Sequence, residues 1–137
     1  MNRSDFIKLA ELRLHEVKVL LDAEKFDGAY YLCGYIVECA LKACIAKKTK
    51  EYDFPDKKLV TDSYTHDLRK LMESSGLTSD FDKEIKTDTV FRNYWSTVKD
   101  WDENSRYKCF SQQSARDLYM AIADETKGVL KWIKQHW

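Results

Sequence analysis

The chain contains few residues that would interrupt a helix. Among its 137 residues there are one proline and four glycines, and these two residue types disfavour helix interiors most strongly. The alternating apolar and polar pattern of a β-strand is also missing, whereas apolar residues recur at helical spacing. The sequence therefore predicts an all-α fold in one domain over residues 1–137, an up-and-down bundle of four main helices plus a short extra helix.

Two polar stretches separate the predicted helices. Residues 49–64 hold the only proline, and residues 100–111 are rich in charged and polar side chains, so both are predicted to be loops. Thr87, Asp88 and Thr89 interrupt a helical stretch, which is therefore either kinked or divided into two shorter helices. The predicted helical segments are 4–24, 27–48, 66–75, 79–99 and 111–133.

The chain has no excess of charge of either sign. Its 23 basic and 23 acidic side chains leave a formal net charge of zero, so contact with nucleic acid or an anionic membrane would need a local basic cluster. No stretch reaches the ~20 apolar residues that span a bilayer. The first residues also lack the apolar core and cleavage site of a secretion signal. These features predict a cytoplasmic protein with no membrane partner.

Patterns typical of metal sites and disulfide frameworks are missing. The four cysteines include no C-x-x-C pair, and none of the three histidines has a histidine or cysteine three or four residues away. Zinc sites and many disulfide frameworks need such spacings. We therefore expect reduced thiols and no metal or other cofactor.

One charged pair interrupts the most apolar segment, "YYLCGYIVECALKA". Tyr31, Tyr35, Glu38 and Lys42 form one stripe along a helix that is otherwise apolar nearly all round. A buried charge needs a partner, and glutamate four residues before lysine is the favourable order for an ion pair. Three interpretations are open: a stripe that faces solvent, a dimer contact or internal ion network, and a polar pocket.

Three segments occur in order before a long final helix: "AELRLHEVKVLLDAEKFDGAYYLCGYIVECALKACI", "THDLRKLM" and "WDENSRYKCF". In this order and spacing they resemble the HEPN family (higher eukaryote and prokaryote nucleotide-binding domains). The resemblance implies a cytoplasmic, usually homodimeric helical bundle of prokaryotes. Many members are encoded beside a nucleotidyltransferase-fold protein, the two acting as toxin and antitoxin. Others act in phage defence or RNA metabolism, or have no assigned activity.

The resemblance assigns roles to particular positions. The stripe matches an aromatic pair followed by Glu and Lys, and His66 with Leu68 matches a His-x-Leu pattern that opens a later helix. Arg106 and Tyr107 match an Arg-Tyr pair, in which Lys108 replaces the proline common in relatives. Ribonuclease members carry an arginine, four to six further residues and then a histidine, near the start of the final helix. No arginine of this chain is followed by a histidine in that range.

These positions define the predicted site. Candidate catalytic residues are His66, for proton transfer, and Arg106, for stabilising charge on the phosphorane. The predicted nucleotide- or RNA-binding residues are Lys42, Trp101, Arg106 and Tyr107, with Lys47, Lys48 and Lys50 as further cations. The predicted polar pocket consists of Tyr31, Tyr35, Glu38, Lys42 and His66. Within it, we expect Glu38 and Lys42 to pair with each other and with groups from the Arg106 loop.

The predicted function is a nucleotide- or RNA-associated module, the helical partner in a prokaryotic toxin–antitoxin or defence system. One alternative is a metal-independent endoribonuclease toxin, which the missing Arg–His motif disfavours. Another is a purely protein–protein interaction module with an exposed aromatic patch, either around Trp132 and Trp137 or along the Tyr31 stripe. Expected partners are a second copy of the chain (a homodimer), a nucleotidyltransferase-fold protein and a nucleotide or RNA ligand.

Overall fold

α-Helices account for most of the chain. The computed structural model describes residues 1–49 and 53–137, and these ranges contain eight α-helices, one 3-10 helix and no β-strand. The predicted all-α class is confirmed, but the predicted count of helices is not, because the final helix is split and a predicted loop contains a helix. The helices are α1 (Arg3–Asp22), α2 (Phe26–Lys48), α3 (Lys57–Ser63), α4 (Leu68–Ser74), α5 (Thr78–Thr87), α6 (Thr89–Val98), η1 (Glu103–Tyr107), α7 (Gln112–Ala123) and α8 (Val129–Lys134).

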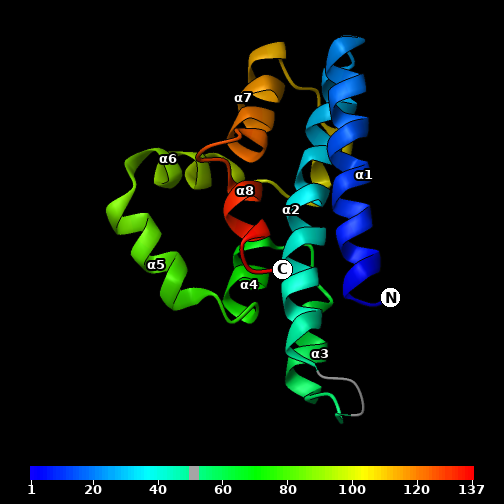
Figure 1. Ribbon diagram of the computed structural model, residues 1–137. Coiled ribbons are helices and arrows are strands. Elements are labelled where there is room, and N and C mark those ends of the chain that lie inside the picture. Colours follow the sequence, from blue (N-terminus) through cyan, green and yellow to red (C-terminus); the bar gives the residue numbers. More distant parts are fainter. Residues whose placement is uncertain (50–52) are drawn as a thin grey trace.

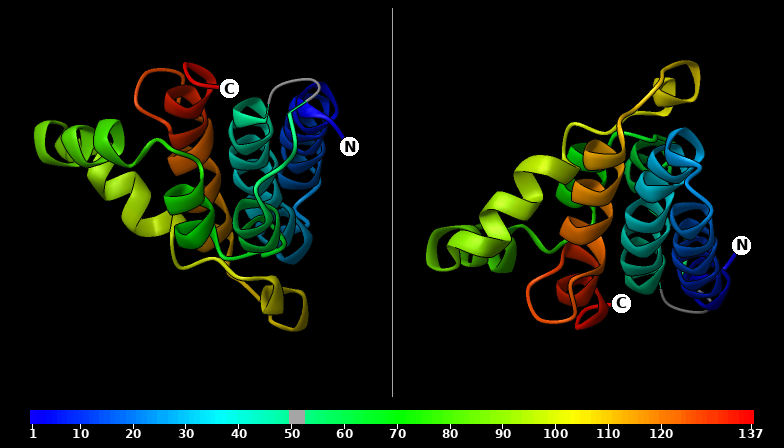
Figure 2. Two further views of the ribbon diagram at one scale, coloured as in Figure 1. Left: turned by 90° about the horizontal axis from the view of Figure 1, so that it is seen from below. Right: turned by 90° about the horizontal axis from the view of Figure 1, so that it is seen from above.

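The central helix is α2, which forms an antiparallel hairpin with α1 (Figure 1). It packs against α1, α4, α7, α8 and η1. Figure 2 shows α1, α2, the α7–α8 pair and the α5–α6 pair following one another across the molecule. Burying a large aliphatic side chain contributes about 1.5–3 kcal/mol, so α2 is the main source of the core. Its side chains with at most 3% exposure include Ala29, Cys33, Ile36, Val37, Ala40, Leu41 and Cys44.

By length and composition, α2 also qualifies as a membrane-spanning helix. Its most apolar window has a mean hydropathy of 1.3, and 61% of that window is buried inside the protein. No other helix within residues 1–49 and 53–137 meets the same criteria. The apolar character of α2 is explained by its position in the core, where other helices cover it.

Two aspartates end helices that the apolar pattern alone would continue. Asp88 separates α5 from α6, and its carboxylate caps α6 by accepting from the Phe91 N–H at 3.0 Å. Asp124 ends α7 and accepts from the backbone N–H groups of the next turn. Gly128 follows, where a Cβ would lie 2.5 Å from the Asp124 carbonyl oxygen, so only glycine fits. The predicted final helix over 111–133 is therefore two helices joined by a tight turn.

Both predicted loops contain a short helix. Asp56 caps α3 by accepting from the Leu59 N–H at 2.9 Å. Asp102 caps η1 by accepting from the Asn104 N–H at 2.7 Å. Helices of one or two turns carry too few residues for a hydrophobic period to reveal them. In Figure 2, η1 projects from one side of the molecule.

Candidate functional site

Three residues form a charged network on one side of α2. Lys42 Nζ lies 2.9 Å from Glu38 Oε1, and His66 Nδ1 lies 2.9 Å from Glu38 Oε2. An ionised carboxylate only accepts hydrogen bonds, so both nitrogens donate. Glu38 is 5% exposed, so these two groups, and not water, supply the hydrogen bonds that its buried carboxylate needs. The predicted pairing of Glu38 with Lys42 is present, and the interpretation of Glu38 as solvent-facing is wrong.

The position of α4 brings His66 to Glu38. Asp67 caps α4 by accepting from backbone N–H groups of its first turn. Leu68 and Leu71 are fully buried, and α4 packs on α2. His66 directly precedes the cap, with a side chain that is 46% exposed. The network thus joins a buried carboxylate to an imidazole that solvent reaches.

Two tyrosines extend the site along α2. The hydroxyls of Tyr31 and Tyr35 lie 3.1 Å apart. The Tyr35 ring packs edge-to-face against the His66 ring, with 5.9 Å between the centroids. Burial raises the pKa of the Tyr35 hydroxyl, and its hydrogen bond with Tyr31 raises it further. Tyr35 is therefore a neutral phenol beside the imidazole.

A further cation comes from η1. The Arg106 guanidinium lies 4.9 Å from the centroid of the Tyr107 ring, and Tyr107 is 78% exposed. Tyr107 raises the pKa of Arg106, and Tyr31 adds to the effect, which places Arg106 at the Tyr31 end of the stripe. The described hydrogen-bond partners of the Glu38 carboxylate are Lys42 and His66, and neither belongs to the Arg106 loop. The prediction that groups from the Arg106 loop pair with Glu38 is therefore wrong.

Trp101 anchors η1 and does not face a ligand. It is 2% exposed, and its ring packs edge-to-face on Tyr35 at 5.2 Å. It also lies so close to Gly34 that a Cβ on this glycine would be 1.9 Å from the indole Cδ2. The predicted role of Trp101 in stacking on a nucleotide is wrong, because no base can reach a ring that is buried to this degree. Trp101 instead holds η1, and with it Arg106, against α2.

The other predicted cations hold neighbouring segments to the end of α2. Lys47 donates to the carbonyl oxygen of His136 at 3.1 Å, and Lys48 donates to that of Ser74 at 3.2 Å. Lys50 lies outside the described residues. The two described lysines thus make structural contacts at some distance along α2 from Arg106.

The aromatic residues near the end of the chain pack inward. Trp132 is 7% exposed and contacts Phe81 and Phe91, with ring centroids 5.8 and 5.5 Å away. Trp137 is partly buried against the same core. The predicted exposed aromatic patch around these two tryptophans is therefore wrong.

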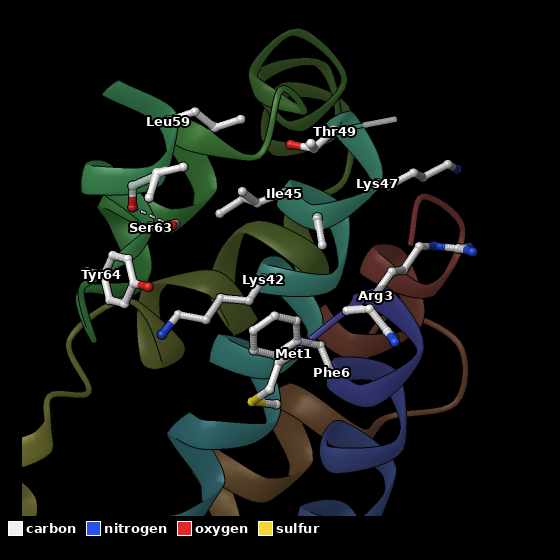
Figure 3. Close-up of a pocket in the computed structure, with 13 residues that line it drawn as sticks. Met1, Arg3, Phe6, Lys42, Ile45, Lys47, Thr49, Leu59, Ser63 and Tyr64 are labelled. Carbon is white, nitrogen blue, oxygen red and sulfur yellow. Dashed lines mark hydrogen bonds between the residues drawn. The ribbon is translucent and has the colours of Figure 1, made fainter. Parts of the chain in front are cut away.

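A cavity adjoins the network at Lys42. It has a volume of about 1040 Å³ and lies between the start of α1, the second half of α2 and α3 (Figure 3). The cavity was not predicted, because the residues of α3 were expected to form a loop and no sequence signal joins these three segments. Its described lining residues are Met1, Asn2, Arg3, Phe6, Lys42, Ile45, Ala46, Lys47, Thr49, Leu59, Val60, Ser63 and Tyr64.

The family of the chain follows from a comparison with known families. A family model described as the HEPN domain matches residues 4–136, nearly the whole chain. The chain belongs to the HEPN family. The resemblance seen in the sequence is thereby confirmed, and HEPN membership indicates a nucleotide- or RNA-related module. Comparisons with curated proteins and with solved structures give no match.

The structure of this HEPN chain brings a histidine and an arginine from different segments to one tyrosine. The His66 ring packs on Tyr35. The Arg106 guanidinium partly offsets the rise in the pKa of the Tyr35 hydroxyl. The Arg–His spacing of the ribonuclease members is missing from the sequence. In this chain, tertiary packing and not sequence spacing relates the candidate histidine and the candidate arginine to the same tyrosine.

Proposed function

We propose that this HEPN chain is an RNA- or nucleotide-associated binding module that serves as the helical partner in a prokaryotic toxin–antitoxin or defence system. The observation that carries the binding role is the placement of His66 beside Tyr35 and of Arg106 beside Tyr31, two positions of one stripe of α2. Segments far apart in sequence supply these groups, and the buried Glu38 holds His66 in place. Exposed Tyr107 adds an aromatic face beside the guanidinium. A guanidinium and an aromatic ring together suit a phosphate and its neighbouring base.

The separation of the cations favours an extended ligand. Arg106 lies beside Tyr31, and Lys42 is eleven residues further along the same helix. At about 1.5 Å of rise per residue these positions are roughly 16 Å apart. A ligand that reaches both positions must therefore extend along the helix, as successive phosphates of a single strand do. The stripe therefore fits a short stretch of single-stranded RNA better than a mononucleotide.

A binding assay tests this proposal. Fluorescence anisotropy of a labelled ten-nucleotide single-stranded RNA is measured against the wild type, Arg106→Ala and Tyr107→Ala. Loss of one stacked base costs about 1–3 kcal/mol, so Tyr107→Ala is expected to weaken binding by about 5- to 150-fold. Arg106→Ala is expected to lower the slope of log K against log salt by about 1. Arg92→Ala on α6, which is also exposed, is the matched control and should bind as the wild type does.

The outcomes separate the binding role from the alternatives. Equal affinity of the wild type and both η1 variants would remove this face from RNA binding. Titration with ATP by calorimetry tests the mononucleotide alternative. If neither ligand binds, the interaction-module alternative becomes the better description of the chain.

A second candidate function is metal-independent RNA cleavage, because the His66 ring packs on Tyr35 and the Arg106 guanidinium lowers the pKa of the hydroxyl of that tyrosine. Such cleavage needs a group that transfers protons and a cation that stabilises the phosphorane. Purified protein is incubated with total RNA, beside His66→Ala and Arg106→Ala variants. Cleavage that disappears in both variants supports the endoribonuclease; cleavage that persists in both excludes these residues from the mechanism.

The proposed biological context needs a different test. We propose that the chain forms a homodimer and acts with a nucleotidyltransferase-fold protein encoded beside it. Light scattering gives the oligomeric state in solution. Expression of the chain alone and together with the product of the adjacent gene should show growth arrest that the second protein relieves. Normal growth in both cases would contradict the toxin–antitoxin role without touching RNA binding.

A further inference from the structure

The cavity at the end of α2 has an apolar floor. Phe6, Ile45, Leu59 and Val60 contribute its apolar side chains, one or more from each of α1, α2 and α3. Its volume of about 1040 Å³ lies at the upper end of the range of small-molecule sites, about 300–1,000 Å³. The cavity is therefore large enough for a ligand with a sizeable apolar part.

The charges around the cavity are of one sign. Within the described part of the chain, its lining includes the cations Arg3, Lys42 and Lys47 and no carboxylate side chain. This is notable in a chain with a net charge of zero. Arg3 and Lys47 already donate to backbone carbonyl groups of Trp137 and His136. Figure 3 shows both extending to the side opposite Lys42.

Lys42 is the cation that faces the cavity interior. In Figure 3 its side chain extends from α2 toward Tyr64, which follows α3. Its side chain is 17% exposed, and Glu38 takes one of its three N–H donors. A second acceptor in the cavity would satisfy a further donor, and an anionic acceptor would make the stronger, charge-assisted hydrogen bond. Glu38 and His66 fix the position of the ammonium for this role.

We infer that this cavity binds an amphipathic anion: an apolar tail with a single carboxylate or phosphate head. The tail contacts Phe6 and Ile45, and the head accepts from Lys42 and from the Tyr64 hydroxyl. Charge complementarity and the apolar floor together select this class over a neutral apolar ligand. Lys42 is common to this inference and to the RNA proposal, but the inference does not rest on RNA binding, because Arg106 and Tyr107, which the RNA assay tests, do not line the cavity.

Titration with the fluorescent anion 8-anilinonaphthalene-1-sulfonate tests the inference. We expect saturable binding to the full folded chain, at least tenfold weaker in Lys42→Met. Lys18→Met is the matched control, since Lys18 also makes an ion pair one helical turn away, with Asp22 on the exposed side of α1. Ala46→Phe fills the cavity without changing charge and should abolish binding. Circular dichroism melts confirm that each variant is folded.

Displacement of the probe identifies the ligand class. Decanoate and decyl phosphate represent the two heads, and decanol is the uncharged control. We expect at least one anion to displace the probe at a concentration tenfold lower than decanol does. Equal displacement by decanol, or equal probe affinity of the wild type and Ala46→Phe, would overturn the inference. The wild-type and Ala46→Phe results decide this even if Lys42→Met does not fold.

The RNA assay keeps the two proposals apart. Ala46→Phe should bind labelled RNA as the wild type does, and Arg106→Ala should bind the fluorescent anion as the wild type does. Failure of RNA binding in the wild type would therefore leave the cavity inference standing. Probe binding that is lost in Arg106→Ala would contradict a separate site at α1, α2 and α3.

Discussion

The two sides of α2 are held to the rest of the protein by different interactions, apolar packing on one side and hydrogen bonds with ring contacts on the other. One side presents Ile36, Val37 and Leu41, each fully buried, to the helices around it. The other side presents Tyr31, Tyr35, Glu38 and Lys42, which are held by hydrogen bonds and by ring contacts with His66 and Trp101. Apolar contacts are non-directional, so any side chain of suitable size serves. Polar contacts in a buried place need a defined partner at a defined distance.

Within one helix, the apolar side therefore serves mainly stability, and the polar side carries the residues of the proposed function. The apolar side determines how α1, α4, α7 and α8 pack on α2. The polar side depends on groups that arrive from other segments, and these are the groups proposed to contact a ligand. Substitutions on each side should therefore behave differently, and four of them test the comparison in order of decreasing effect.

The largest effect is expected on the apolar side. Leu41→Ala removes a fully buried side chain and leaves a cavity, so the free energy of unfolding should fall by about 4 kcal/mol. Leu41→Met conserves volume and should cost less than about 1.5 kcal/mol. Urea denaturation followed by circular dichroism measures both. A similar loss of unfolding free energy in the two variants would mean that packing on this side depends on the shape of the side chain and not on its volume.

The next effect is expected on the polar side. Glu38→Ala leaves Lys42 and His66 without their common partner, and the free energy of unfolding should fall by about 3 kcal/mol. The double variant Glu38→Leu/Lys42→Met removes both charges and should recover most of that loss. The same urea denaturation experiment applies. If Glu38→Ala and Lys42→Ala each unfold as the wild type does, the pair contributes nothing to stability and the comparison fails.

A smaller effect is expected where η1 meets α2. A Cβ at Gly34 would overlap the Trp101 ring, so Gly34→Ala should displace the indole and cost about 2 kcal/mol. A red shift of tryptophan emission should accompany it. Gly28→Ala is the matched control in the same helix. Its Cβ would meet Leu20 at an ordinary 3.6 Å, and it should stabilise α2 by about 0.5 kcal/mol. An unchanged emission spectrum in Gly34→Ala would contradict the anchoring role of Trp101.

The effect that is smallest at neutral pH is that of the Cys33 thiol, which becomes measurable only in alkali. Burial raises the pKa of the Cys33 thiol to about 12, from 9.0 for an unperturbed cysteine. Between pH 9 and pH 12 the thiol therefore stays protonated in the folded state, whereas in the unfolded state it loses its proton. This contribution is fully present below pH 9 and falls by about 1.4 kcal/mol per pH unit as pH rises toward 12.

Stability measured between pH 8.5 and 10.5 checks the pH effect. Cys33→Ala should have a smaller alkaline slope than the wild type, whereas Cys109→Ala, which changes an exposed thiol, should leave the slope unchanged. Equal slopes in all three proteins would show that Cys33 does not contribute. The apolar side of α2 would then have no measurable dependence on pH through this thiol.

Features that depend on neighbours in sequence were predictable. The predicted segment 27–48 differs from α2 by one residue at its start, and the interruption at Asp88 was foreseen as one of two options. The Glu38–Lys42 pair follows from a spacing of four residues on one helix. Ser111, the first residue of the predicted final segment, caps α7. Each of these depends on contacts within about one helical turn.

Features that depend on distant segments were not predictable. The burial of Trp101 requires Gly34 to lie opposite it, and nothing in the local sequence of either residue shows this. The contact of His66 with Glu38 requires α4 to pack on α2 after an intervening segment that includes α3. The turn at Asp124 had a usable signal in Gly128, but the apolar residues on both sides continue a helical period and obscure it.

The amino-acid sequence by itself determined that the chain is helical, that α2 is its most apolar helix, and that Glu38 has a lysine within reach. These properties depend on propensity and on spacing along one helix, which operate before any helix packs. Only the tertiary structure decided that His66 shares the carboxylate, that Trp101 is a buried anchor, and that a cation-lined cavity opens beside Lys42. Burial and long-range pairing depend on which surfaces face each other, and this is set by packing of the whole chain.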